Sequence, residues 1–387
     1  MESVPWSSSL GFGLLECLFA ACSFLCLLAG ASTTLHTSLI LPSASVWLEL
    51  LSAFLIGSSF NILLATFVWQ YVSPSLHPPR SPLAYLPPLG ACGLAIALPP
   101  ALPYALPLSS SAHALLAIIG AWKVIDALAG TRAQAVVGNG RLPFIIFVTS
   151  AVEYKTDGRS IPRAKPMSWL RELAAVGCTF AGLALSISMV RLMSTEGPPL
   201  LSSPQLKAWV RLYAEVWTIY LFLNVFTGSF STLLALAGYT PQIIFRNPLL
   251  RGTSISDFWS RRWNMLIHGL IKRTVFLPLL AVGMPSWTAG LAARAFHEYA
   301  FALQQPELAK SLGRCLAFFV LQAPIVSLEK LLAEKLPIPW PLRRYPVLCT
   351  LGWTLLLVPF APLFMHPLRT SGVLDQIFLL TPRLSFT

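Results

Sequence analysis

Long apolar runs recur along the whole chain, and this pattern decides the fold class. A helix crosses the hydrocarbon layer of a membrane in about 20 apolar residues. Runs of about this length or more lie at 11–31, 46–69, 83–106, 112–130, 172–193, 208–238, 274–293, 312–333 and 346–365. They are continuous rather than alternating, which excludes an outer-membrane barrel. We therefore expect an all-α, polytopic membrane helix bundle with about eight or nine spans. The run 142–152 is too short to cross and is expected to be re-entrant or interfacial.

Composition supports the same class. The chain has 387 residues, of which 55% are hydrophobic and 11% are charged. Soluble domains carry roughly a quarter charged residues, so a soluble enzyme and a disordered protein are both excluded. No internal repeat or appended soluble module is visible, and we expect one membrane domain over residues 1–387. The first basic residue is Arg80, so the first apolar run is interpreted as a retained span rather than a signal peptide.

The net charge of +12 is explained by loops rather than by a nucleic-acid partner. Basic residues cluster at 155–171, 246–273 and 335–344. Successive clusters are separated by two predicted spans, so all three fall on one side of the membrane. Positive loops lie on the cytosolic side, and this pattern predicts that side for all three clusters.

The segment 240–273 is too polar to span a membrane and too apolar for a free loop. It predicts an interfacial amphipathic helix near 254–272. Asp257, Arg261, Asn264 and His268 are spaced by three or four residues, which places them on one face of such a helix. This face would line a cavity or the headgroup layer. A helix whose Asp257–Arg261 pair is simply solvated fits the spacing equally well.

Other ionisable residues inside apolar runs are also candidates, because such groups are costly in a membrane. His297 stands among apolar residues, where a neutral imidazole would act as a general base or simply sit at the interface. The remaining histidines, at 36, 77, 113 and 366, are expected to be interfacial. The acids Asp126, Glu172, Glu215 and Glu329 are expected to pair within the bundle. No metal site, disulfide or phosphate-binding glycine loop is indicated.

Two motifs taken together favour the functional interpretation of these residues. DFWSRRWN (257–264) is followed about thirty residues later by FHEY (296–299). The pair resembles the wax-synthase-like branch of the membrane-bound O-acyltransferase superfamily. The resemblance covers about residues 240–300 and implies that Asn264 and His297 are the catalytic pair. It implies substrate-binding roles for Asp257, Trp259, Arg261, Arg262, Trp263 and His268.

The resemblance also implies the reaction. An acyl group would move from acyl-CoA, as co-substrate, to a hydroxyl of a lipophilic acceptor, with no permanently bound cofactor. Arg261, Arg262 and Lys272 would attract the CoA phosphates or, equally well, the membrane surface. The compact length is similar to fungal members that acetylate terpenoid or meroterpenoid alcohols in secondary metabolism, in the endoplasmic reticulum. Long-chain alcohols and sterols are the alternative acceptors, and a transporter or lipid-binding membrane protein is the alternative class.

Overall fold

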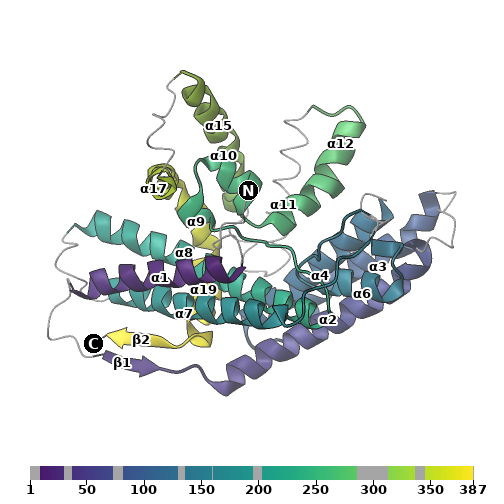
Figure 1. Ribbon diagram of the computed structural model, residues 1–387, viewed down its shortest axis with the longest axis horizontal. Coiled ribbons are helices and arrows are strands. Elements are labelled where there is room, and N and C mark those ends of the chain that lie inside the picture. The colour runs from purple at the N-terminus through teal and green to yellow at the C-terminus, as the bar shows by residue number, and fades with distance from the viewer. Residues whose placement is uncertain are drawn as a thin grey trace.

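The computed structural model describes residues 9–29, 37–72, 82–129, 136–158, 160–194, 203–285, 313–335 and 345–386. Within them the chain is almost entirely helical (Figure 1). The helices are α1 (Ser9–Ala29), α2 (Ala44–Val72), α3 (Leu86–Ala97), α4 (Pro107–Leu128), α6 (Arg141–Thr149), α7 (Ser168–Ser194), α8 (Pro204–Leu236), α9 (Pro248–Arg251), α10 (Ile255–Asp257), α11 (Met265–Ile271), α12 (Leu277–Ala281), α15 (Arg314–Lys335), α17 (Pro346–Leu357), α18 (Ala361–Thr370) and α19 (Val373–Leu380). The strands are β1 (Thr37–Ile40) and β2 (Arg383–Phe386).

Seven helices in the described part of the chain are long and apolar enough to cross a membrane, which confirms the polytopic helix bundle. The expected span at 83–106 is shorter, because Pro99–Ala101 forms a 3₁₀ turn and ends the apolar helix near Ala97. The run 274–293 begins as α12 and then passes outside the described residues. The short run 142–152 forms the nine-residue α6, too short to cross, as predicted.

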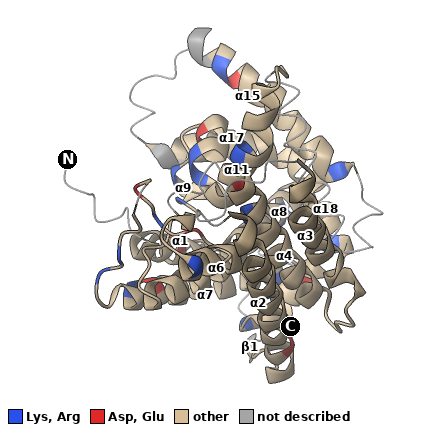
Figure 2. Ribbon diagram, turned by 90° about the vertical axis from the view of Figure 1, so that its right-hand side faces the viewer, with Lys and Arg blue, Asp and Glu red and all other residues tan. Residues whose placement is uncertain are grey.

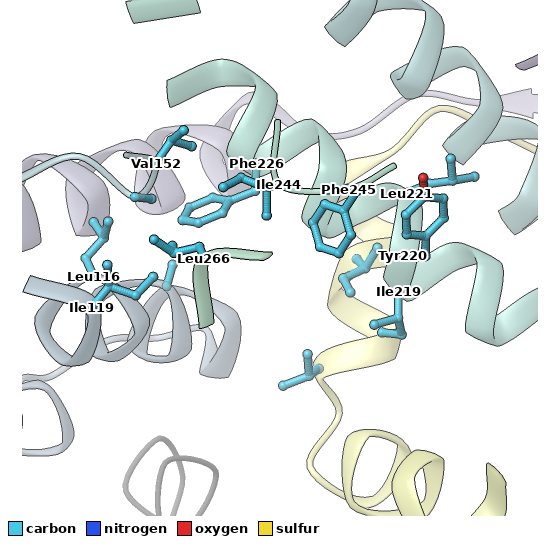
Figure 3. Packing of buried hydrophobic residues seen from close by; sticks show 14 of the residues in the cluster. Leu116, Ile119, Val152, Ile219, Tyr220, Leu221, Phe226, Ile244, Phe245 and Leu266 are labelled. Carbon is cyan, nitrogen blue, oxygen red and sulfur yellow. The ribbon is translucent and has the colours of Figure 1, made fainter. Parts of the chain in front are cut away.

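The long helices pack in two groups. α7 packs along α1 and α8, while α2 packs along α4 and α6 (Figure 1). An extended segment at Ile244–Phe245 runs between the groups and contributes to the core of both. Ile244 lies with Phe226 and Leu266, whereas Phe245 lies beside Tyr220 (Figure 3). The antiparallel pair β1–β2 brings residues near the two ends of the described chain together.

The loops that carry the first two basic clusters lie side by side. The backbone N–H of Lys155 donates to the carbonyl of Thr240 at 2.8 Å, and that of Ala164 donates to Gly238 at 2.9 Å. Gly238 has φ +82°, a conformation that glycine adopts at little cost. The first basic cluster therefore lies beside the segment that leads into the second, and the predicted common side of the membrane stays a prediction.

Figure 2 shows that charged residues are sparse along the long helices.

Candidate functional site

The segment that carries the DFWSRRWN motif is not one helix. α10 continues as a π turn over Phe258–Arg262, the chain breaks at Trp263–Asn264, and α11 begins at Met265. Asn264 has φ +42°, and its Oδ1 accepts a hydrogen bond from the backbone N–H of Ile267 at 3.3 Å. Asparagine tolerates this left-handed conformation better than most residues. The expectation of one continuous helix near 254–272 with Asp257, Arg261, Asn264 and His268 on one face is therefore wrong.

The π turn also changes the partner of Asp257. Its Oδ2 accepts from Arg262 Nε at 2.5 Å, whereas Arg261 is exposed. A π turn brings residues five apart together, instead of four apart, which explains why the expected Asp257–Arg261 pair does not form. Burial raises the pKa of Asp257. The hydrogen bonds from Arg262 and Thr253, together with the positive charge of Arg262, outweigh this effect, so the pKa of Asp257 lies below its ordinary value. Asp257 is therefore ionised and holds the turn closed.

Side chains from α15 and α17 fix the start of the motif. The carboxylate of Glu329 accepts from the backbone N–H groups of Ile255 at 2.7 Å and Ser256 at 3.0 Å. The carbonyl of Gly252 accepts from Thr350 Oγ1 at 2.7 Å and from Trp353 Nε1 at 2.8 Å. A Cβ at Gly252 would lie 2.8 Å from the backbone oxygen of Pro248 and 3.0 Å from the indole ring of Trp353 on α17, so the close approach of α17 needs glycine. These contacts were not predicted, because local spacing carries no information about partners 73 to 101 residues away.

The aromatic residues of the motif form one cluster. Trp263 stacks on Phe258 with ring centroids 5.2 Å apart, and it contacts Phe245 and Tyr220 at 5.6 and 5.8 Å. Trp259 contacts Phe258 edge to face at 4.7 Å. Such pairs add stability beyond the burial of their area. The cluster joins the motif to α8.

An apolar pocket of about 100 Å³ adjoins this cluster. We call it the aromatic pocket. Trp259 and Trp263 line it from the motif, and α8, α15, α17 and α18 close the other sides. Its walls are Leu212, Tyr213, Val216, Leu249, Phe258, Trp259, Trp263, Phe318, Phe319, Trp353, Thr354, Leu357, Val358, Ala361, Phe364 and Met365.

The predicted site residues Asn264 and His268 belong to the segment that follows the aromatic residues of the motif. Asn264 follows Trp263 directly, and within the described residues no group accepts a hydrogen bond from its Nδ2. His268 and Lys272 are exposed on the segment that follows. Desolvation by packed neighbours and then the charge of Lys272 lower the pKa of His268, which keeps its imidazole neutral. His297 lies outside the described residues.

A second, polar cavity of about 310 Å³ lies between α1, α7, α8 and residues 240–245. Lys155, Arg171 and Glu172 line it together with threonine and serine hydroxyls. Asn224 also lines it, and its Nδ2 donates to the buried carboxylate of Glu16 at 3.1 Å. Glu16 also accepts from Tyr220. Glu16 was not among the predicted site residues, although a lone acid inside the first apolar run is a signal of a functional or paired group.

Charged groups on and around α4 form what we call the ion cluster. Arg273 donates to Asp126 at 2.9 Å and to Glu153 at 2.7 Å. Lys123, which is fully buried, donates to the carbonyls of Phe147 and Ser150 at 2.8 and 2.7 Å. The cluster ties the segment after α11 to α4.

The other expectations for buried polar groups are mostly confirmed. Asp126 pairs with Arg273, Glu172 with Arg171, and Glu215 with Arg211 and Arg369, whereas Glu329 bonds to backbone N–H groups. His113 was expected at the interface and is instead fully buried, with Nδ1 2.7 Å from the hydroxyl of Tyr104. His36 and His77 lie outside the described residues.

Comparison with known proteins gives relatives of one kind. No protein-family model matches the chain. It is 29% identical over 138 residues to a probable long-chain-alcohol O-fatty-acyltransferase of Arabidopsis thaliana, over 35% of this chain and 37% of the relative. A second such Arabidopsis protein is 28% identical over 171 residues, over 41% of this chain and 49% of the relative. An Arabidopsis acyl-CoA–sterol O-acyltransferase is 42% identical over 52 residues, over 13% of this chain and 15% of the relative.

These similarities support the membrane-bound O-acyltransferase superfamily at low identity. The matches span less than half the length of the relatives. Their names give long-chain alcohols and a sterol as acceptors, and none of the three names a terpenoid.

Proposed function

We propose that this protein is an acyl-CoA-dependent O-acyltransferase of the membrane, and that its acceptor is a long-chain alcohol or a sterol. The observation that carries the proposal is the aromatic pocket, which is walled by Trp259 and Trp263 of the motif. Asn264 follows Trp263 in the sequence and is not itself part of the pocket lining. An apolar pocket beside a few placed polar groups is the usual form of a ligand site. The names of the relatives favour the same acceptors.

The proposed chemistry needs one base and one hydrogen-bond donor. His297, assigned by the resemblance, would take the proton of the acceptor hydroxyl as its oxygen attacks the thioester carbonyl carbon. The carbon–sulfur bond then breaks and CoA leaves as a thiolate, which takes a proton. Asn264 Nδ2 would donate to the carbonyl oxygen as negative charge develops there, an interaction typically worth 10²–10³-fold in rate. Its Oδ1 is already used to cap α11, which fixes the amide.

The cations of the motif would serve two purposes. Arg262 is committed to Asp257 and to the carbonyl of Arg246, so we assign it to holding the turn. Arg261 and Lys272 are exposed, and they would bind the phosphates of CoA at the cytosolic surface. The reaction would then take place where a soluble donor meets a membrane acceptor, and the endoplasmic reticulum is the proposed location.

Acetyl transfer to a terpenoid alcohol is the finer proposal that the resemblance to fungal members of the superfamily suggests. A pocket of about 100 Å³ leaves room for a short chain or the end of a longer one, so pocket size alone fits both donors. We favour long-chain alcohols or sterols, because the relatives name them.

The test is ester formation by microsomes that contain the protein. Labelled acyl-CoAs from acetyl to stearoyl are supplied with hexadecanol, a sterol or a terpenoid alcohol. We expect ester with at least one pair, and a loss of more than about 10²-fold in His297→Ala, as for removal of a general base. His366→Gln is the matched control, because His366 does not line the aromatic pocket. Unchanged turnover in His297→Ala would remove this residue from the mechanism. Specific binding of the alcohol without ester from any pair would favour the transporter or lipid-binding class.

A further inference from the structure

Helix α15 carries an amide group at membrane depth that has a single side-chain partner. Gln322 is 4% exposed. Its Oε1 accepts from Trp259 Nε1 at 3.1 Å, and its Nε2 donates to the carbonyl of Phe318 on its own helix at 3.1 Å. Polar side chains are costly inside an apolar helix. The contact that Gln322 makes outside its own helix is the hydrogen bond that holds the indole of Trp259.

Trp259 forms one wall of the aromatic pocket. Its ring contacts Phe319 at 5.7 Å and Phe318 at 6.1 Å, and both rings also line the pocket. α15 therefore supplies two walls of the pocket and the hydrogen bond that orients a third. Without an acceptor for Nε1 the indole would be free to turn, because edge-to-face contacts alone hold aromatic rings in several orientations.

The pocket is small enough for this orientation to matter. Its volume of about 100 Å³ is below that of an engineered cavity of about 150 Å³ that binds benzene. It therefore seats only a short length of an aliphatic chain, and a turn of one indole changes the available space by a large fraction.

The docking of α15 has another polar anchor besides Gln322. Glu329 lies seven residues further along α15, and its carboxylate already anchors the helix to the backbone N–H groups of Ile255 and Ser256. The hydrogen bond from Trp259 to Gln322 is therefore better explained by a role in shaping the aromatic pocket than by a role in packing α15.

We propose that Gln322 is a positioning residue that sets the size of the aromatic pocket through Trp259, and so selects the aliphatic chain of the substrate. This rests on the proposed function. The chain belongs either to the acyl donor or to the alcohol, and both present the same methylenes to the pocket.

The experiment compares Gln322→Leu, Trp259→Phe and the double variant in microsomes. One arm varies the acyl-CoA at a fixed alcohol, and the other varies the alcohol at a fixed acyl-CoA. In Gln322→Leu we expect KM for the preferred chain to rise about 5-fold, as for loss of one buried hydrogen bond, with kcat little changed and the optimum moved to longer chains. Trp259→Phe should do the same, and the double variant should add nothing further. The arm in which the optimum moves identifies the source of the chain.

The control is Gln376→Leu, which removes an amide that accepts from the backbone N–H of Leu108 at 2.5 Å, away from the pocket. It should leave the chain profile unchanged. Additive effects of the two single changes, or a chain profile in Gln322→Leu equal to that of the unaltered protein, would overturn the proposal. If Gln322→Leu fails to fold, an unchanged chain profile in Trp259→Phe overturns it.

A binding measurement separates this proposal from the proposed function. Purified protein is titrated with tritiated hexadecanol and tritiated palmitoyl-CoA in a scintillation proximity assay. A shift in binding between the unaltered protein and Gln322→Leu, without ester from any pair, would sustain the pocket and remove the acyltransfer. Ester formation together with identical binding and chain profiles in the two proteins would sustain the acyltransfer and reject the role of Gln322 in the pocket.

Discussion

The ion cluster and the motif segment both carry polar groups within an apolar bundle, yet they differ in how these groups are used. In the ion cluster Arg273 bonds to two carboxylates and Lys123 to backbone carbonyls. In the motif segment, Asn264 uses one end of its amide to cap α11, and a pocket lies beside the neighbouring tryptophans. We therefore expect unused hydrogen-bonding capacity near a cavity to indicate function better than the burial of a charge at membrane depth does.

Arg273→Met tests the structural side of this comparison and should have the largest effect on stability. It leaves Asp126 and Glu153 short of one cation in a buried environment, and breaking a buried pair in this way typically costs about 3–5 kcal/mol. We expect a large fall in the apparent Tm of the protein in detergent, or failure to accumulate. Lys272→Gln, an exposed neighbour, should change the Tm little. Similar Tm values for the two variants would show that the ion cluster does not hold the fold.

Elements that depend on composition over a whole helix could be predicted from the sequence, and those that depend on one backbone angle could not. The bundle, the short run at 142–152 and the pairing of Asp126 and Glu215 followed from hydropathy and from the cost of an unpaired charge. The left-handed Asn264 and the π turn before it did not, because neither conformation changes the pattern of apolar and polar positions. For the same reason the spacing of Asp257 and Arg261 suggested the wrong ion pair.

In the predicted site, the motif residues could be identified from the sequence, whereas the distant residues that hold them could not. Trp259 and Trp263 line an apolar pocket, and their expected role in substrate binding stays a prediction. The residues that hold them, Gln322, Glu329 and Trp353, are far away in sequence and carry no local signal. His113 was misjudged because its partners, Tyr104 and Phe60, become visible only when α2 and α4 are packed together.

Asp257→Asn should have an intermediate effect that depends on pH. The folded pKa of Asp257 is lowered, so its contribution to stability is fully present above the unfolded pKa of about 3.9 and is lost as the pH falls through the folded value. Loss of the charged hydrogen bond to Arg262 should cost about 1.5–3 kcal/mol at neutral pH. The difference in Tm between the unaltered protein and the variant should therefore stay constant from pH 7 to about 4 and shrink as the pH is lowered further. A difference that persists unchanged below about pH 4 would mean that the ion pair contributes nothing.

Asn264→Gly should have the smallest effect on stability and a large effect on activity, which is the sharpest contrast with Arg273→Met. Glycine adopts the left-handed conformation of residue 264 without strain, and replacing an asparagine cap by glycine costs only a few tenths of a kcal/mol. The Tm should therefore remain close to that of the unaltered protein. Ester formation should fall about 10²-fold if Nδ2 stabilises the developing oxyanion, with kcat affected more than KM.

Asn264→Asp is the companion variant that separates the two ends of the amide. Its carboxylate retains the acceptor for the N–H of Ile267 and removes the donor. We expect a Tm near that of the unaltered protein and activity as low as that of Asn264→Gly. Full activity in Asn264→Asp would show that the cap, and not Nδ2, is what the reaction requires, and Asn264 would then join Arg273 among the residues that only hold the fold.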